Sequence, residues 1–142
     1  MPKLIFVNLP VTDLPRAKAF YEAVGAKNNP QFTDDTAACM GLSDTIHVML
    51  LTHDKYKQFT SKQIADTQKT SAVLLAISED SREGVDATLG RALKAGAKEP
   101  RDKQDHGWMY DRAFEDLDGH TWEVMWMDVE AATKAMAKNQ AA

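Results

Sequence analysis

The side chains in this sequence that are best suited to binding a metal or moving a proton are four histidines and the carboxylate of Glu123. A catalytic metal site needs several such ligands, for example two histidines and one carboxylate around non-haem iron. His120 precedes Glu123 by three residues, so on a strand the two side chains point to opposite faces. His47 and His53 share a strand parity, but His53 is expected beyond the end of its strand, and His106 is expected in a loop. The spacing therefore predicts no histidine-based metal site.

Glu123 itself has two interpretations that the sequence leaves open. In the first, an arginine or a tyrosine satisfies its carboxylate and the residue has no chemical role. In the second, the carboxylate faces a cavity, where it binds a cationic or hydroxyl group of a ligand. It would act as a general base there if burial raised its pKa.

The aromatic residues of the second half of the chain indicate how the strand that carries Glu123 is oriented. Trp122 and Trp126 have the parity opposite to that of Glu123. If Glu123 faces a cavity, these two tryptophans are expected in the core beneath a helix. Trp108 and Tyr110 share one parity on the preceding strand, and either line the cavity or pack in the core.

Two segments of the chain repeat one strand–helix plan. The first has an extended apolar run at residues 4–11 and then a helix whose start is marked by Thr12 or Asp13. The second has an apolar run at residues 72–77 and then a helix whose start is marked by Asp80, Ser81 and Glu83, which resemble a capping box. Apolar residues recur at helical spacing in both helices, and both end in the tripeptide Gly-Ala-Lys. This internal repeat predicts two similar modules.

Short strands follow each predicted helix. They are expected near Phe32, at 37–42, at 46–52, near Lys98, at 108–114 and at 120–127. Asp118-Gly119 predicts a tight turn before the last strand. Each half is therefore predicted to be a βαβββ module of an α+β fold. One helix covers only part of a four-stranded sheet, so we expect the two modules to pair as a curved mixed sheet around a cleft.

Length and composition predict a single globular domain. The chain has 142 residues, of which 44% are hydrophobic and 27% charged. We place module 1 at about 3–53, a linker at about 54–70, module 2 at about 71–128 and a helical tail at about 129–142. Cys39 is the only cysteine, so it cannot form a disulfide within the chain, and it is expected to be a small buried side chain.

Charge and hydropathy exclude several classes of partner. The formal net charge is −4 and the basic residues are scattered, so nucleic acid is not an expected partner. The longest uninterrupted apolar stretch, about Ala72 to Ile77, is much too short to cross a membrane. The amino-terminal residues do not have the pattern of a secretory signal, so a cytoplasmic location is expected.

Two motifs in the chain resemble those of a known superfamily. LPVTDL at 9–14, followed by AFYE at 19–22, resembles the opening signature of the vicinal oxygen chelate superfamily, which contains glyoxalases, bleomycin-resistance proteins and extradiol dioxygenases. FEDLDGHTWEV at 114–124 resembles its closing signature, except that Leu117 stands where proline is usual. The resemblance implies paired βαβββ modules, a U-shaped cavity and a homodimer. Members include metal-dependent lyases, ring-cleaving dioxygenases and antibiotic-sequestering proteins that catalyse nothing.

The resemblance also implies where metal ligands would stand. Catalytic members hold a divalent metal with side chains from four equivalent strand positions. In this chain those positions fall on Phe6, on Leu50 or Met49, on Ala72 or Val73, and on Glu123. Only Glu123 is an ordinary ligand for a divalent metal, so we predict no catalytic metal and no other cofactor. The alternative is a divalent metal bound by an unconventional set of ligands.

The sequence therefore predicts a protein that binds a small, partly apolar molecule in its cleft without a catalytic metal, and that forms a homodimer. The residues expected to line the cleft are Phe6, Asn8, Met49, Leu50, Trp108, Tyr110 and Glu123. The alternatives are a metal-dependent lyase or dioxygenase of the glyoxalase type, and a metal-free isomerase that uses Glu123. The residues do not specify the ligand.

Overall fold

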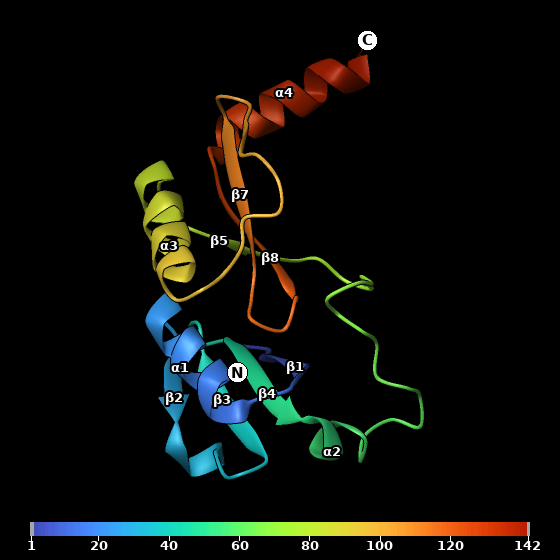
Figure 1. Ribbon diagram of the computed structural model, residues 1–142. Coiled ribbons are helices and arrows are strands. Elements are labelled where there is room, and N and C mark those ends of the chain that lie inside the picture. Colours follow the sequence, from blue (N-terminus) through green and yellow to red (C-terminus); the bar gives the residue numbers. More distant parts are fainter. Residues whose placement is uncertain (1, 142) are drawn as a thin grey trace.

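The computed structural model describes residues 2–141, which form two modules of the same order, βαβββ, joined by a linker (Figure 1). The first module contains β1 (Ile5–Val11), α1 (Leu14–Val24), β2 (Lys27–Asn29), the short 3-10 helix η1 (Pro30–Phe32), β3 (Ala37–Gly41) and β4 (Ile46–Thr52). The second contains β5 (Leu75–Ser78), α3 (Arg82–Lys94), β6 (Gln104–Asp105), β7 (Met109–Glu115) and β8 (Thr121–Met127). Helix α2 (His53–Tyr56) begins the linker, and α4 (Val129–Ala141) follows β8.

Each module forms its own four-stranded mixed sheet. The strand orders are β1-β4-β3-β2 and β5-β8-β7-β6. In both sheets the first strand of the module pairs in parallel with the last, and the other pairs are antiparallel. The predicted α+β class and the duplicated βαβββ plan are therefore confirmed, and neither sheet closes on itself.

Local signals explain where the two long helices begin and end. Asp13 caps α1 by accepting a hydrogen bond from the backbone N–H of Arg16. Ser81 caps α3 by accepting one from the backbone N–H of Gly84. Gly25 ends α1 with a φ of 122°, a conformation that glycine adopts without a steric penalty.

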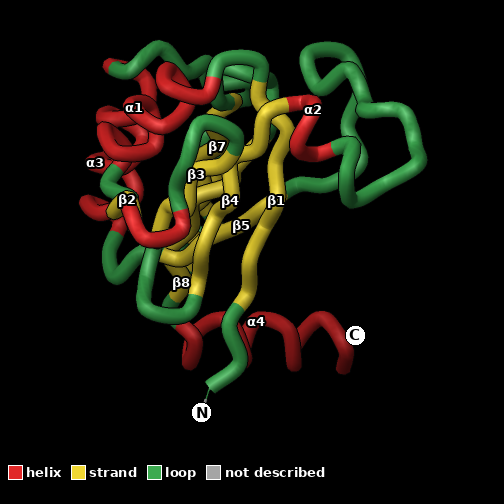
Figure 2. Tube along the Cα trace, turned by 90° about the horizontal axis from the view of Figure 1, so that it is seen from below, coloured by secondary structure: helices red, strands yellow, loops and turns green. Residues whose placement is uncertain are grey.

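Helices α1 and α3 pack against each other and cover one face of each sheet (Figure 2). The core beneath them contains Phe20 and Tyr21 of α1, Leu89 of α3 and Trp122 of β8, so it is shared by both modules. Within residues 2–141 no helix covers the opposite face of either sheet, and below we call these faces the open faces.

Three strand predictions differ from the structure. The segment near Phe32 is the 3-10 helix η1, because Pro30 lies in its first turn and the side chain of Asn29 caps it. Lys98 forms only an isolated bridge with Glu115, and the strand that pairs with β7 at this edge is β6. The apolar run at 72–77 becomes a strand only from Leu75 onward.

A buried hydrogen-bond network joins the two modules. The hydroxyl of Tyr21 donates to Oδ2 of Asp116 at 2.6 Å and accepts from Nε1 of Trp122 at 2.9 Å. Oδ1 of Asp118 accepts from the backbone N–H and from the hydroxyl of Thr12. The closing signature therefore fixes the β7–β8 turn against the beginning of α1.

The linker is held against the same turn. The hydroxyl of Thr67 donates to the carbonyl of Asp118 at 2.6 Å, and the side chain of Gln68 donates to the carbonyl of Leu117. Gly119 has a φ of 88°, and a Cβ added there would lie 2.8 Å from the carbonyl carbon of Thr67 and closer still to its oxygen. Only glycine fits this turn, because the linker backbone passes directly over it.

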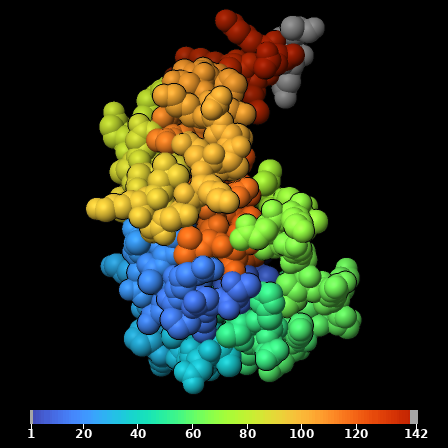
Figure 3. Space-filling view, in the orientation of Figure 1, coloured from blue at the N-terminus to red at the C-terminus, as the bar shows by residue number. Residues whose placement is uncertain are grey.

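Helix α4 extends away from the sheets at the end of the second module (Figures 1 and 3). Ala132 of this helix is buried, while Val129 and Met136 are exposed. Among residues 2–141, no helix combines the length and the apolar character needed to cross a bilayer.

Candidate functional site

A partly enclosed pocket of about 430 Å³ lies where β1, β5, the linker and the β7–β8 turn come together. Its volume is within the range of pockets that hold small organic molecules. Strand β1 contributes residues 7–10 and β5 contributes Leu75, while the β7–β8 turn and the start of β8 contribute residues 119–121. The linker supplies the rest of the wall, and Figure 3 shows it as a ridge beside the two modules.

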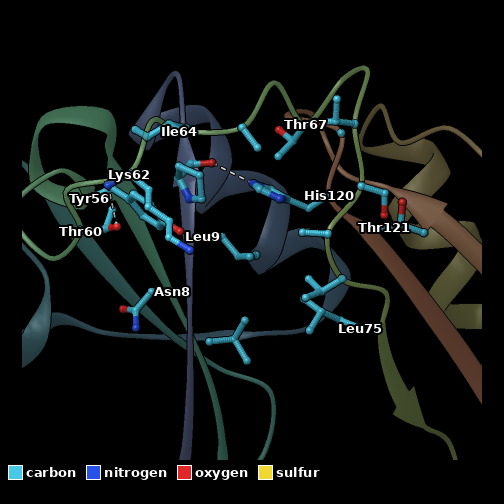
Figure 4. Close-up of a pocket in the computed structure, with 18 of the residues that line it drawn as sticks. Asn8, Leu9, Tyr56, Thr60, Lys62, Ile64, Thr67, Leu75, His120 and Thr121 are labelled. Atoms are coloured by element: carbon cyan, nitrogen blue, oxygen red, sulfur yellow. Dashed lines mark hydrogen bonds between the residues drawn. The ribbon is translucent and has the colours of Figure 1, made fainter.

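Most of the pocket wall is apolar, and its polar groups are mostly uncharged. The apolar residues are Val7, Leu9, Pro10, Ile64, Ala65, Ala72, Val73 and Leu75. Tyr56, Thr60 and Lys62 lie on the same side as Asn8, and Leu75 and Thr121 lie on the opposite side (Figure 4). The pocket therefore has a mainly apolar wall, with Lys62 and three uncharged polar residues together on one side and further polar residues, such as Thr121, on the other.

His120 belongs to this pocket but its ring is already engaged. Nε2 of His120 lies 2.8 Å from the carbonyl oxygen of Pro10, and the residue is only 9% exposed. A carbonyl oxygen only accepts hydrogen bonds, so Nε2 carries the hydrogen of this contact. His120 therefore holds the β7–β8 turn to β1 and forms part of the pocket floor.

Three residues predicted to line the cleft lie on the open face of the first sheet. Phe6 stacks on His47 with 4.9 Å between ring centroids, and 49% of Phe6 is exposed. Asn8 is paired in register with Met49 on the same face. Of the seven predicted residues, only Asn8 also lines the 430 Å³ pocket.

Three other predicted residues lie elsewhere. Leu50 is completely buried in the core beneath α1, so Met49 is the member of that pair that faces the open side. Tyr110 is also in the core, and its hydroxyl donates to Asp86 of α3 at 2.7 Å. Trp108 precedes β7 and stacks on His106 in the β6–β7 loop, with 5.8 Å between ring centroids.

Glu123 lies on the open face of the second sheet, next to an arginine that the sequence analysis did not include. Nη2 of Arg101 lies 3.0 Å from Oε1 of Glu123 and 3.0 Å from Oδ2 of Asp111. Asp111 is 8% exposed, and its Oδ1 has no hydrogen-bond partner among the described residues. Burial raises the pKa of the Asp111 carboxyl, the Arg101 guanidinium opposes that shift, and Glu123 adds to it. The geometry thus corresponds to the first interpretation of Glu123, a carboxylate satisfied by an arginine.

These residues do not fit a divalent metal. At the other positions where the resemblance places ligands, the open face of the first sheet carries Phe6 and Met49, and the residue paired with Glu123 on β5 is Ala76. Within residues 2–141, no three His, Cys, Asp or Glu side chains group closely enough to hold one ion. The cation beside Glu123 is the guanidinium of Arg101, and whether the protein carries a metal stays a prediction.

The main residues that the sequence analysis missed are Tyr56 and Lys62 of the linker wall and Arg101. The motif FEDLDGH did point to the turn that carries His120, but not to a pocket beside it. No local pattern marks the linker residues, because hydrogen bonds to the distant Leu117 and Asp118 fix their place.

The comparisons with known proteins agree with this architecture. A family model described as the Glyoxalase/Bleomycin resistance protein/Dioxygenase superfamily matches residues 3–124. The chain belongs to this superfamily. The resemblance of the two signatures is therefore confirmed. No curated protein is similar enough in sequence to count as a match.

Several solved structures share the fold. A glyoxalase/bleomycin resistance protein/dioxygenase family enzyme from Burkholderia phytofirmans PsJN has a TM-score of 0.72 and 20% identity, over 89% of this chain and 99% of that one. The fosfomycin resistance protein FosX from Mesorhizobium loti has a TM-score of 0.67 and 19% identity, over 94% and 98%. A hypothetical protein from S. aureus has a TM-score of 0.73 and 23% identity, over 89% and 95%. At these identities the similarity shows the fold alone.

Proposed function

We propose that this superfamily member binds a small, partly apolar molecule in the pocket between β1, β5 and the linker, and that it does so without a catalytic metal. The observation that carries the proposal is the pocket itself, about 430 Å³ with a mainly apolar wall and Asn8 among its polar groups. Burying an apolar ligand in such a wall is favourable, and a few polar groups set its orientation.

The surroundings of Glu123 support the metal-free part of the proposal. A metal at this carboxylate would have to displace Arg101, which contacts both Glu123 and Asp111 at 3.0 Å. Displacing the guanidinium would break both of its contacts, and Ala76, which is paired with Glu123 on β5, offers a metal no ligand. Elemental analysis of protein purified without chelators or a metal-binding tag is expected to give far less than one equivalent of Ni, Zn, Fe or Mn. A value near one equivalent would contradict this part.

The binding part is tested with naphthol, an uncharged apolar probe that is smaller than the pocket. We expect saturable binding of one naphthol per chain, measured by its fluorescence. Ala72→Trp places a large side chain in the pocket and is expected to abolish binding, because Ala72 is exposed and lines the pocket. Ala87→Trp is the matched control, since Ala87 is an exposed residue of α3 that does not line the pocket. Equal binding by both variants would overturn the proposal.

We also propose that the open faces are covered by a second copy of the chain. Phe6 is 49% exposed on the first sheet, and Leu74, next to the start of β5, is 60% exposed. Large exposed apolar side chains on the face of a sheet are typical of protein–protein contact surfaces. Light scattering is expected to give a dimer at micromolar concentration and a monomer for Phe6→Glu. A monomer for the unmodified chain would overturn this proposal.

A further inference from the structure

The pocket between β1, β5 and the linker has a charge pattern unlike that of the rest of the chain. The protein is acidic, with 21 Asp and Glu residues against 17 Lys and Arg. Among the described residues that line the pocket, none is Asp or Glu, and Lys62 is the one with a permanent charge. The local charge of the pocket is therefore positive in a protein whose net charge is negative.

The polar groups next to Lys62 are predominantly donors that the protein does not use. Within residues 2–141, Nζ of Lys62, the hydroxyl of Tyr56 and the side-chain amide of Asn8 take part in no hydrogen bond or ion pair. These three residues lie on one side of the pocket, as Figure 4 shows. An ammonium group donates three hydrogen bonds, a phenol one and an amide two, so the wall is suited to a ligand group that accepts several.

Several other polar groups of the pocket are engaged within the protein, whereas the side chains of Gln63, Ser71 and Thr121 form no hydrogen bond within residues 2–141. His120 is engaged with the carbonyl of Pro10, and the hydroxyl of Thr67 donates to Asp118. The hydroxyl oxygen of Thr60 accepts from the backbone N–H of Lys62. Lys62, Tyr56 and Asn8 thus place the permanent charge of the pocket and three unused donor groups on one wall, opposite Leu75 and Thr121.

We propose that the pocket selects small apolar molecules that carry a carboxylate, with Lys62 as the counter-ion and Tyr56 and Asn8 as further donors. This inference rests on the proposed binding function and names the class of ligand. The apolar body of the ligand packs against Val73 and Leu75, and its carboxylate points to the wall that carries Lys62. A cationic ligand is disfavoured because no carboxylate of the described pocket wall would neutralise it.

The experiment compares naphthoate, naphthol and naphthylmethylamine, which share the apolar ring and differ in charge. Lys62→Gln is expected to weaken the binding of naphthoate about three- to tenfold, the range for a partly exposed charge-assisted contact. The affinity of the same variant for naphthol is expected to stay within about twofold of that of the unmodified protein, since the uncharged probe gains little from the ammonium. Naphthylmethylamine is expected to bind more tightly to Lys62→Gln than to the unmodified protein. Lys69 is also in the linker but outside the pocket, so Lys69→Gln is the matched control and is expected to leave the affinities for all three probes unchanged.

Two outcomes would overturn the inference, and they are distinguishable. If Ala72→Trp abolishes naphthol binding but Lys62→Gln leaves naphthoate unchanged, the pocket binds small molecules and its preference for carboxylates is wrong. If Ala72→Trp changes the binding of neither probe, the ligands bind elsewhere and the proposed function fails together with the inference. Retained naphthoate affinity in Lys62→Arg would support a role of the positive charge.

Discussion

Replacing Tyr21 by phenylalanine is expected to destabilise the junction between the two modules while leaving the shape of the core unchanged. The change removes one hydroxyl that lies completely buried between α1 and the β7–β8 turn. Trp122 then loses the acceptor for its indole N–H, and Asp116 loses the donor to its Oδ2. Both groups stay buried, so water does not replace the lost partner.

The magnitude follows from these two contacts. A buried donor left without a partner costs roughly 1–3 kcal/mol, and a hydrogen bond to a charged group contributes roughly 1.5–3 kcal/mol. We expect the free energy of unfolding to fall by about 3 kcal/mol at pH 7, because the two costs are not fully additive. With a urea dependence of about 2 kcal/mol per molar, the unfolding midpoint falls by roughly 1.5 M.

The pH dependence provides a second observable. Burial raises the pKa of the Asp116 carboxyl, and the hydrogen bond from Tyr21 lowers it. Loss of the hydroxyl therefore raises the folded-state pKa of Asp116 further. A raised folded-state pKa means that the folded protein binds the proton more tightly, so stability is lost as the pH rises through it. The cost of Tyr21→Phe is thus largest at neutral pH and shrinks as the pH falls through the folded-state pKa of Asp116.

Urea unfolding followed by tryptophan fluorescence, at pH 7 and at acidic pH, measures both effects. Tyr56→Phe is the matched control, because Tyr56 is half-buried and its hydroxyl forms no hydrogen bond within the described residues. Its effect is expected to be within about 0.5 kcal/mol. A loss of less than 1 kcal/mol for Tyr21→Phe at pH 7 would refute the interpretation that this hydroxyl joins the modules.

Two further predictions concern the turn and the open face. Gly119→Ala is expected to destabilise the protein by roughly 1–3 kcal/mol more than Gly107→Ala, measured by urea unfolding; both glycines have positive φ, but only the first is overlaid by Thr67. Equal costs would show that the linker does not pass over the turn. Arg101→Gln is expected to raise the pKa of Asp111 further, because the guanidinium opposes the upward shift that burial causes. The carboxyl carbon shift of Asp111, followed by NMR titration, measures this, and an unchanged pKa would exclude their ion pair.

The sequence predicted those parts of the fold that depend on local signals. Asp13 and Ser81 cap their helices through contacts three residues away, so both helix starts were correct. The alternation of polar and apolar residues placed Trp122 in the core and Glu123 on the opposite face. It could not separate Met49 from Leu50, because the run Val48–Leu51 is apolar on both faces of the strand.

Features that depend on distant contacts could not be predicted from local sequence. Residues 72–74 resemble the start of a strand, but all three are exposed. Ala72 and Val73 line the pocket, and Leu74 follows them directly. Strand β6 is made of the exposed polar pair Gln104 and Asp105, which no apolar pattern marks. The linker wall with Lys62 exists because Thr67 is hydrogen-bonded to a turn 51 residues further along the chain.

The most direct test of ligand binding in the pocket is a map of backbone amide shifts during titration with naphthol. Val7, Asn8, Val73 and Thr121 line the pocket, and their amides are expected to shift together and to saturate at one equivalent. The amides of Met125 and Glu123, on the open face of the second sheet, are expected to stay unchanged. Shifts that centre on Glu123 and leave Val73 and Thr121 unaffected would contradict the account and place the ligand on the open face.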